Sequence, residues 1–351
     1  MPVKIADTAH HEGPSAFAQA AELELRHVSK RYPGQRQAAI SDLSLTVPAG
    51  EVCVLVGPSG SGKTTAMRLI NRMIALSDGD ILLGGRSVLA REPRELRREI
   101  GYVIQQVGLF PHLTVGENIA TVPRLLGWDK RRIAERVHEL LALIGLDPEE
   151  MAARYPLQLS GGQRQRVGVA RALAADPPLM LMDEPFGAID PINRARLQDE
   201  FLALQQQVQK TVVFVTHDID EAIKMGDRIA ILREGGVLAQ YDTPSEILTR
   251  PADEFVAQFV GADRALKRLS LTTLAELPLL APDGALGAPA DTRRVPRETT
   301  VHDALSQLLS AGGETLQVTD EEGRVVGLLT LAQVQQLLRD DRAPTTLEKA
   351  S

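Results

Sequence analysis

Cysteine is nearly absent from this chain, which has one, Cys53, in 351 residues. A single thiol excludes a disulfide within the chain and fits a reducing compartment. Cys53 lies in the apolar run 52–56, where a small buried side chain is the ordinary interpretation and a reactive thiol the alternative. Long apolar runs are lacking as well, since none approaches the ~18 residues that a membrane helix needs. We therefore expect a soluble chain whose contact with a membrane would pass through partners.

Basic residues are not in excess, because 39 Lys and Arg against 46 Asp and Glu give a formal net charge of −7. This balance gives no support for a nucleic-acid partner. The first 20 residues lack the basic start and apolar core of a signal peptide, and we expect residues 1–20 to form a flexible tail. A length of 351 residues predicts two domains.

An apolar run followed by a glycine-rich loop is the strongest pattern in the sequence. Residues 52–56 suit a strand buried on both faces of a parallel sheet, and the next eight residues match G-x-x-x-x-G-K-[ST]. The backbone N–H groups of such a loop and of the following helix bind phosphate, and the chance alternative is a mere glycine-rich turn. Lys63 would place a positive charge on the outer phosphates, and the hydroxyl of Thr64 would be a ligand of Mg²⁺. The predicted triphosphate-binding residues are Gly57, Pro58, Ser59, Gly60, Ser61, Gly62, Lys63, Thr64 and Thr65.

Buried strands alternate with helices along most of the chain, which predicts an α/β fold. Antiparallel strands precede the glycine loop, and a largely helical insertion occupies about 106–175. A hairpin with tight turns at Asp78-Gly79 and Gly84-Gly85 is expected between them. The predicted strands are 23–28, 40–47, 52–56, 100–104, 179–182, 211–215, 229–232 and 237–240, and the clearest helices are 131–143, 164–174 and 194–208.

Two adjacent carboxylates end the buried strand 179–182. Ligands of open α/β sheets bind at the carboxyl edge, so Asp183 and Glu184 are expected beside the phosphate loop. Asp183 is placed to hold Mg²⁺, and Glu184 to polarise and orient a water that attacks the γ-phosphate. The alternative is an acidic surface turn.

Leu159-Ser160-Gly161-Gly162-Gln163 resembles the signature peptide of ATP-binding-cassette (ABC) ATPases, although Ser160 alone could be an ordinary helix cap. It precedes the Asp183-Glu184 strand as in that family, and the likeness covers Leu23 to Val260. The resemblance implies an ABC-type P-loop domain at 21–260, with a mixed sheet core, an antiparallel β subdomain and a helical subdomain. It also implies an ATPase that uses Mg²⁺.

The resemblance assigns further roles. Tyr32 is similar to the aromatic that stacks on adenine, with a turn tyrosine as the alternative. Gln105 resembles the glutamine that senses Mg²⁺ and the membrane partner, although Gln106 beside it leaves the position open. Asp190 resembles the residue that communicates across the dimer, and His217 the γ-phosphate histidine, with a polar strand-end residue as the alternative. The implied catalytic residues are Glu184, His217 and Gln105, and the implied Mg²⁺ ligands are Thr64, Asp183 and Gln105.

Two ABC chains pack head to tail, so the resemblance implies a homodimer in which each ATP lies between two copies. Ser160, Gly161, Gly162 and Gln163 would then act on the partner's ATP. The implied partners are a second copy, integral-membrane permease subunits and, indirectly, a substrate-binding protein. The implied location is peripheral, on the cytoplasmic face of the bacterial inner membrane.

The run from Ile100 to Pro111 is most similar to ATPases of quaternary-amine importers, which carry glycine betaine, carnitine, choline or proline. The stretch Pro111 to Asn118 resembles the groove that receives the permease's coupling helix. Importers of another small solute, such as an amino acid or a polyamine, are an alternative. A soluble ABC protein of DNA repair or translation is a remote one.

The C-terminal residues 291–340 resemble one cystathionine-β-synthase (CBS) motif, after an expected linker at 261–290 and before a tail at 341–351. Such a short unit cannot bury an adequate core alone, so we expect it to pair with its copy in the second chain. It could sense ionic strength, bind an adenine nucleotide or only tighten the dimer. Members of that family that bind a nucleotide often have Thr followed three residues later by Asp for the ribose. Here the pair is Thr330 and Gln333, which is equally well a helix capping box.

Overall fold

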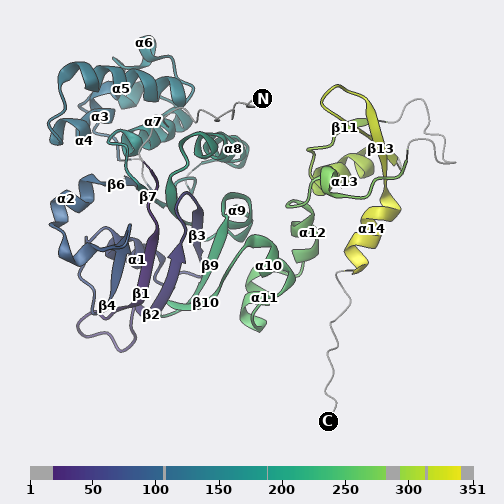
Figure 1. Cartoon of the computed structure of the whole chain (residues 1–351), viewed down its shortest axis with the longest axis horizontal. Helices are drawn as coiled ribbons and strands as arrows, with labels where there is room; N and C mark the ends of the chain where they lie inside the picture. The colour runs from purple at the N-terminus through teal and green to yellow at the C-terminus, as the bar shows by residue number, and fades with distance from the viewer. Residues whose placement is uncertain (1–18, 106–107, 188, 282–292, 313–314, 341–351) are drawn as a thin grey trace, which may run out of the picture. The chain divides into compact units, whose positions relative to one another are not determined.

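The computed structural model describes residues 19–105, 108–187, 189–281, 293–312 and 315–340, and the chain divides into two compact units (Figure 1). The first unit holds residues 1–217 and 232–238, and the second holds 218–231 and 239–351. The boundary therefore falls inside β9 (Arg228–Arg233) and β10 (Val237–Asp242), which are neighbours in a sheet. The predicted tails lie outside the described residues, apart from residues 19 and 20.

An antiparallel sheet forms from the alternating segments near the start of the first unit, as predicted. Its order is β2-β1-β4-β5, and in β2 the side chains of Leu43, Leu45 and Val47 are buried while those between them are exposed. This period of two covers one face of the sheet. The strands are β1 (Leu23–Lys30), β2 (Ile40–Val47), β4 (Asp78–Leu83) and β5 (Arg86–Ser87).

The predicted tight turn at Asp78-Gly79 is wrong, because both residues belong to β4. The β1–β4 register shifts between Arg26 and Ser29, opposite this point. Gly79 has φ +86°, and a Cβ there would lie 2.3 Å from the carbonyl oxygen of His27. A glycine is therefore needed for a bulge rather than for a turn. The turn at Gly84-Gly85, between β4 and β5, is confirmed.

A parallel sheet carries the buried strands of the first unit in the order β3-β8-β7-β6. Every residue of β3 and β8 is buried, as expected for strands covered on both faces. Val215 of β8 is level with Leu55 of β3 on one side and with Asp183 of β7 on the other. The strands are β3 (Val52–Val56), β6 (Ile100–Val103), β7 (Leu179–Asp183) and β8 (Thr211–Val215).

Helices α3 to α7 fall within the segment predicted as a helical insertion (Figure 1). Val137, Leu140 and Leu141 form the buried face of α5, as their spacing predicts, whereas Ile133 is only half-buried. The helices of the first unit are α1 (Lys63–Ile70), α2 (Pro93–Arg98), α3 (Val115–Ile119), α4 (Thr121–Leu125), α5 (Lys130–Leu143), α6 (Pro148–Met151), α7 (Gly161–Leu173) and α8 (Pro191–Val208), with short 3₁₀ turns at Val88–Ala90 and Pro156–Gln158.

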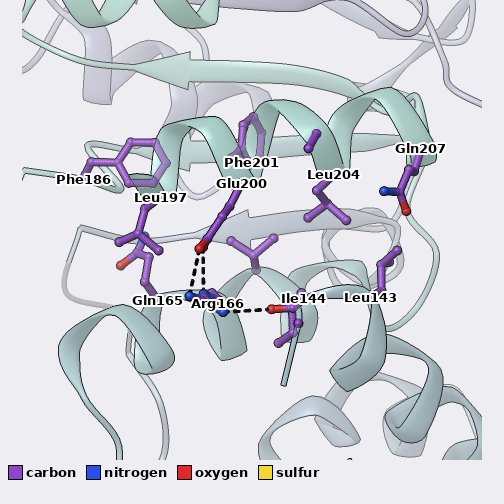
Figure 2. A pocket seen from close by; sticks show the side chains of 13 residues that line it. Leu143, Ile144, Gln165, Arg166, Phe186, Leu197, Glu200, Phe201, Leu204 and Gln207 are labelled. Atoms are coloured by element: carbon purple, nitrogen blue, oxygen red, sulfur yellow. Dashed lines mark hydrogen bonds and ion pairs between the residues drawn. The ribbon is translucent and has the colours of Figure 1, made fainter. Parts of the chain in front are cut away.

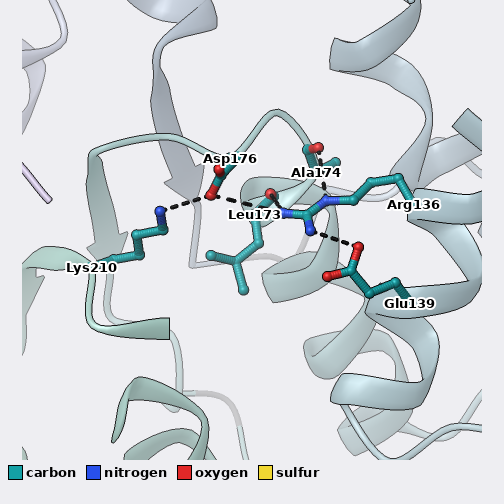
Figure 3. Close-up of polar contacts among 6 residues, drawn as sticks. All are labelled: Arg136, Glu139, Leu173, Ala174, Asp176 and Lys210. Carbon is teal, nitrogen blue, oxygen red and sulfur yellow. Dashed lines mark hydrogen bonds and ion pairs between the residues drawn. The ribbon is translucent and has the colours of Figure 1, made fainter. Parts of the chain in front are cut away.

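Charged side chains join these helices to one another and to the sheet. Arg166 of α7 pairs with Glu200 of α8 at 2.9 Å (Figure 2). At the other end of α7, Arg136 of α5 donates to the carbonyl oxygen of Leu173 at 3.1 Å and lies 3.9 Å from Asp176 (Figure 3). Arg136 thus satisfies a carbonyl that the end of a helix leaves without an intrahelical partner.

Lys210 extends this network to the start of β8. Its side chain has no exposed surface, and its Nζ lies 2.7 Å from Asp176 Oδ1 (Figure 3). A lysine is buried completely only where a carboxylate compensates its charge. Asp176 therefore links the loop after α7 to the parallel sheet.

The second unit contains a small mixed sheet in the order β11-β12-β13, with a parallel first pair and an antiparallel second pair. The sequence predicts a helix at 301–309 and strands at 316–319 and 325–329 in this segment, and the structure contains all three. Its elements are α9 (Ile219–Met225), α10 (Pro244–Thr249), α11 (Glu254–Val260), α12 (Arg264–Leu269), a 3₁₀ turn at Leu274–Glu276, β11 (Arg294–Pro296), α13 (Val301–Ala311), β12 (Thr315–Thr319), β13 (Val325–Thr330) and α14 (Leu331–Asp340).

Part of the segment expected as a linker belongs to the core of this small sheet. Leu269 of α12 and Leu274 are 3% and 0% exposed and pack in one cluster with Val301 and Leu316. Leu280 also forms an antiparallel bridge with Leu328 of β13. Residues 264–280 thus contribute apolar side chains that the small unit would otherwise lack, and the expectation of a plain linker there is corrected.

Thr330 and Gln333 form the capping arrangement at the start of α14. Gln333 N donates to Thr330 Oγ1 at 3.3 Å, and Thr330 N donates to Gln333 Oε1 at 2.9 Å. These reciprocal bonds satisfy backbone donors at the beginning of the helix.

Of the described helices, none has the length and apolar character needed to cross a membrane.

We predict that Lys210→Met lowers the free energy of unfolding by about 3 kcal/mol, because removing one partner exposes the cost of the other buried charge. The control is Arg131→Met, whose pair with Glu135 joins side chains that are 88% and 68% exposed. That change should cost less than about 1 kcal/mol. Urea denaturation measures the free energy of unfolding of both variants. Equal losses would show that the buried Lys210–Asp176 pair contributes no more to stability than the exposed pair.

Candidate functional site

The phosphate loop lies between β3 and α1, where the sequence predicted it. Gly57 has φ +154°, and a Cβ on it would lie 2.2 Å from the carbonyl oxygen of Leu232. Gly62 has φ +86°, and its Cβ would lie 2.4 Å from the carbonyl oxygen of Ala39. Only glycine fits either position. Because α1 begins directly after Gly62, the first N–H groups of the helix face the same space as the loop.

Lys63 spans the base of this loop. Its Nζ donates to the carbonyl oxygens of Gly57 at 2.7 Å and Pro58 at 3.0 Å, and to Ser61 Oγ at 3.3 Å. Burial lowers the pKa of Lys63, and the carboxylates of Glu184 and Asp183 oppose that shift. The ammonium is therefore fixed beside the loop in a position to meet an anion.

Asp183 ends β7 within reach of the loop. Its Oδ1 accepts a hydrogen bond from Thr64 Oγ1 at 3.4 Å. Burial raises the pKa of Asp183, and the Glu184 carboxylate raises it further, against smaller opposite effects of Thr64, Arg68 and Lys63. A desolvated carboxylate beside a hydroxyl is a set of oxygen ligands that fits Mg²⁺. The residues present thus suit the metal that the sequence implied.

Glu184 is held by neighbours on both sides of its carboxylate. Gln105 Nε2 donates to Glu184 Oε2 at 2.9 Å, and His217 Nδ1 lies 3.4 Å from Glu184 Oε1. The backbone of Glu184 has φ +42°, a conformation unusual for a residue with a side chain. Its N–H donates to the carbonyl oxygen of Val215 at 3.0 Å, which anchors this conformation to β8. Strain of this kind is typical of functional positions.

A cavity of about 390 Å³ joins these parts. It brings together the phosphate loop, the start of α1, Glu184 and His217, as predicted from sequences far apart in the chain. Ala39 also lines it, and no local signal marked this residue, because its position follows from the close approach of its backbone to Gly62. The lining residues are Ala39, Ser59, Gly60, Gly62, Lys63, Thr64, Thr65, Glu184 and His217.

Tyr32 lies apart from this lining within the described part of the chain. Its ring instead receives the Lys30 ammonium, with Nζ 5.0 Å from the ring centroid. The adenine-stacking role of Tyr32 therefore stays a prediction. The choice between Gln105 and Gln106 also stays open, because Gln106 lies outside the described residues.

The signature residues begin α7 and are not brought to the cavity of their own chain. Ser160 Oγ accepts from Gln163 N at 3.2 Å, and Gln163 Oε1 accepts from Ser160 N at 2.9 Å. This capping box starts the helix at Gly161 rather than at residue 164 as expected. Ser160 and Gly161 are exposed, so the helix start faces outward.

Asp190 starts α8 in the same manner. Its carboxylate accepts from Asn193 N at 3.1 Å and from Asn193 Nδ2 at 2.8 Å. These hydrogen bonds lower the pKa of Asp190. Like the signature, Asp190 is absent from the lining of the phosphate cavity in the described chain.

Known proteins resemble the chain over most of its length. A profile described as ABC transporter matches residues 40–187. The osmoprotectant import ATP-binding protein OsmV of Salmonella typhimurium is 53% identical over 73% of this chain and 67% of its own length. The glycine betaine uptake system ATP-binding protein YehX of Escherichia coli is 44% identical over 88% of this chain and 97% of its own. A solved ATP-binding cassette, dimeric in a post-hydrolysis state with ADP and phosphate, is 34% identical over 63% of this chain and 98% of its own, with a TM-score of 0.55.

We predict that Asp183→Asn raises the unfolding temperature of the nucleotide-free chain at pH 7. The folded pKa of Asp183 is raised, so its ionised form opposes folding above the ordinary carboxyl pKa and has no such effect below it. The gain should therefore shrink as the pH falls toward about 4. Thermal unfolding between these pH values checks it, with Asp199→Asn on the exposed face of α8 as control. A gain in unfolding temperature that grew as the pH fell would contradict a raised pKa of Asp183.

Proposed function

The chain belongs to the ABC transporter family of ATPases, and on that premise we propose that it powers the import of a quaternary-amine osmoprotectant. The observation that carries this proposal is the match to the YehX protein over 97% of that relative's length. That relative is named for glycine betaine uptake, and a relative of Bacillus subtilis, 54% identical over 70% of this chain, for glycine betaine, carnitine and choline. The motif from Ile100 to Pro111 supports the same class of solute.

ATP would bind with its phosphates in the loop from Gly57 to Thr65 and its adenine against Tyr32. The N–H groups of the loop and of the start of α1, together with Lys63, match the charge of the phosphates. Thr64, Asp183 and Gln105 would hold Mg²⁺, which neutralises charge on the phosphates when bound. Gln105 then has to leave the hydrogen bond that it now gives to Glu184.

Glu184 would act as the base for hydrolysis. Its carboxylate, between Gln105 and His217, can accept a proton from a water that attacks the γ-phosphorus. The bond from that phosphorus to the bridging oxygen breaks as the water oxygen bonds, which leaves ADP and phosphate. His217 would contact the γ-phosphate and keep Glu184 oriented.

The site would be completed by a second copy of this chain. Ser160, Gly161, Gly162 and Gln163 form an outward-facing helix start away from their own phosphate cavity. A helix start stabilises an anion, so α7 of the partner would meet the γ-phosphate, with Asp190 at the same interface. ATP binding then closes the dimer and hydrolysis opens it.

The mechanical output would pass to membrane subunits. We place the chain on the cytoplasmic face of the bacterial inner membrane, bound to permease subunits that receive solute from a binding protein. The CBS-like unit would pair with its copy in the dimer. A structural role is favoured for Thr330 and Gln333, since their side chains already form the cap of α14.

We predict that Glu184→Gln slows ATP hydrolysis by about 10²–10⁴-fold, because the amide cannot accept the proton of the water. ATP affinity should be retained, and the closed dimer should accumulate with ATP. Glu135→Gln, a change on an exposed position of α5, is the control. Phosphate release, nucleotide binding and size-exclusion chromatography measure these properties. Hydrolysis at the rate of the unmodified chain would show that Glu184 is not the base.

Uptake by cells tests the proposed solute. The gene for this chain would be expressed with its neighbouring permease and binding-protein genes in a host that lacks its own osmoprotectant uptake. We predict uptake of labelled glycine betaine that falls to background with Glu184→Gln, and no uptake of glutamine or spermidine. Uptake of glutamine or spermidine in place of glycine betaine would contradict the proposal and favour the other class of importer.

A further inference from the structure

A second cavity, of about 260 Å³, lies between the end of α5, α7 and α8 (Figure 2). Among the described residues, none lines both this cavity and the phosphate cavity. Most of its walls are aliphatic or aromatic side chains, among them Val169, Phe186, Leu197, Phe201 and Leu204. Such a surface is typical of a site for a small organic molecule.

The side-chain amide of Gln165 is an unsatisfied polar group in this lining. Gln165 of α7 is 3% exposed, and within the described chain its Nε2 has no hydrogen-bond partner. The charged side chains of the described lining, unlike this neutral amide, are paired. Arg166 Nε lies 2.9 Å from Glu200 Oε2, and Arg166 also donates to Glu200 Oε1 at 2.9 Å and to the carbonyl oxygen of Ile144 at 3.4 Å (Figure 2). A buried amide donor without a partner is costly, so a bound acceptor would relieve a real penalty.

The volume limits the size of the occupant. A cavity of roughly 150 Å³ accepts a benzene ring, and ligand pockets of drug-sized molecules begin at roughly 300 Å³. The volume of about 260 Å³ lies between them. It therefore suits one ring with a short polar substituent.

We propose that this cavity is a binding site for a small aromatic molecule with one hydrogen-bond acceptor, which Gln165 Nε2 donates to. The ring lies against the apolar walls formed by Phe186, Leu197, Phe201 and Leu204. Binding at this site is independent of the proposed transport function, because it uses none of the ATP-site residues.

The test compares two probes of the same size, acetophenone and ethylbenzene, which differ by the ketone oxygen. Calorimetry or protein-detected NMR on the full chain at about millimolar probe should give saturable binding, with acetophenone tighter by about fivefold, the effect of one net hydrogen bond. Gln165→Leu should abolish that preference while ethylbenzene still binds. The variant should fold, because it removes an unsatisfied buried donor.

The second part of the test uses a substitution that fills the cavity. Ala203 is exposed at the edge of the lining, so Ala203→Phe should block both probes with an unchanged unfolding midpoint. Ala195→Phe, on the same helix but outside the lining, is the matched control and should bind like the unmodified chain. The proposal is overturned if the unmodified chain binds neither probe, if both bind equally well, or if Ala203→Phe leaves binding intact.

Discussion

The parallel pairing of β8 with β3 and β7 is the constraint on which the ATP site depends. Val215 is level with both Leu55 and Asp183, so the two flanking strands end at the same edge. The phosphate loop starts at Gly57, two residues after Leu55, and Glu184 directly follows Asp183. The Glu184 N–H bonds to the carbonyl oxygen of Val215, which fixes the carboxylate against β8. The register of the sheet therefore sets the distance between the phosphate loop and Glu184, the proposed base.

Desolvation then gives the site its chemistry at a cost in stability. The pKa of Lys63 is lowered and that of Asp183 is raised by burial, so both charged forms are disfavoured in the free chain. A bound nucleoside triphosphate, with the Mg²⁺ that we propose, would supply the compensating charges. The folded chain thus keeps the charges of Lys63 and Asp183 at this edge of the sheet at a cost in stability, and they serve to bind the nucleotide.

Sequence reasoning succeeded where the signal is local. The apolar run 52–56, the glycine loop and the Asp183-Glu184 pair each carry their chemistry in adjacent residues, and so does the capping pair Thr330 and Gln333. It failed where tertiary packing decides. Gly79 supports a bulge against His27 instead of a turn, and Leu269 and Leu274 join a core formed by residues much later in the chain. The unsatisfied amide of Gln165 could not be foreseen either, because the walls of its cavity come from α5, α7, α8 and the loop that holds Phe186.

The central claim is that each chain carries half of a catalytic site, with Lys63 in one half and Ser160 in the other. Mixing two inactive variants, Lys63→Ala and Ser160→Arg, tests it most directly. In a mixed dimer the intact loop of the Ser160→Arg chain meets the intact signature of the Lys63→Ala chain, so hydrolysis should return on mixing although neither variant hydrolyses ATP alone. If the mixture stays as inactive as its components, while chromatography shows that mixed dimers form with ATP, the signature does not act on the partner's nucleotide.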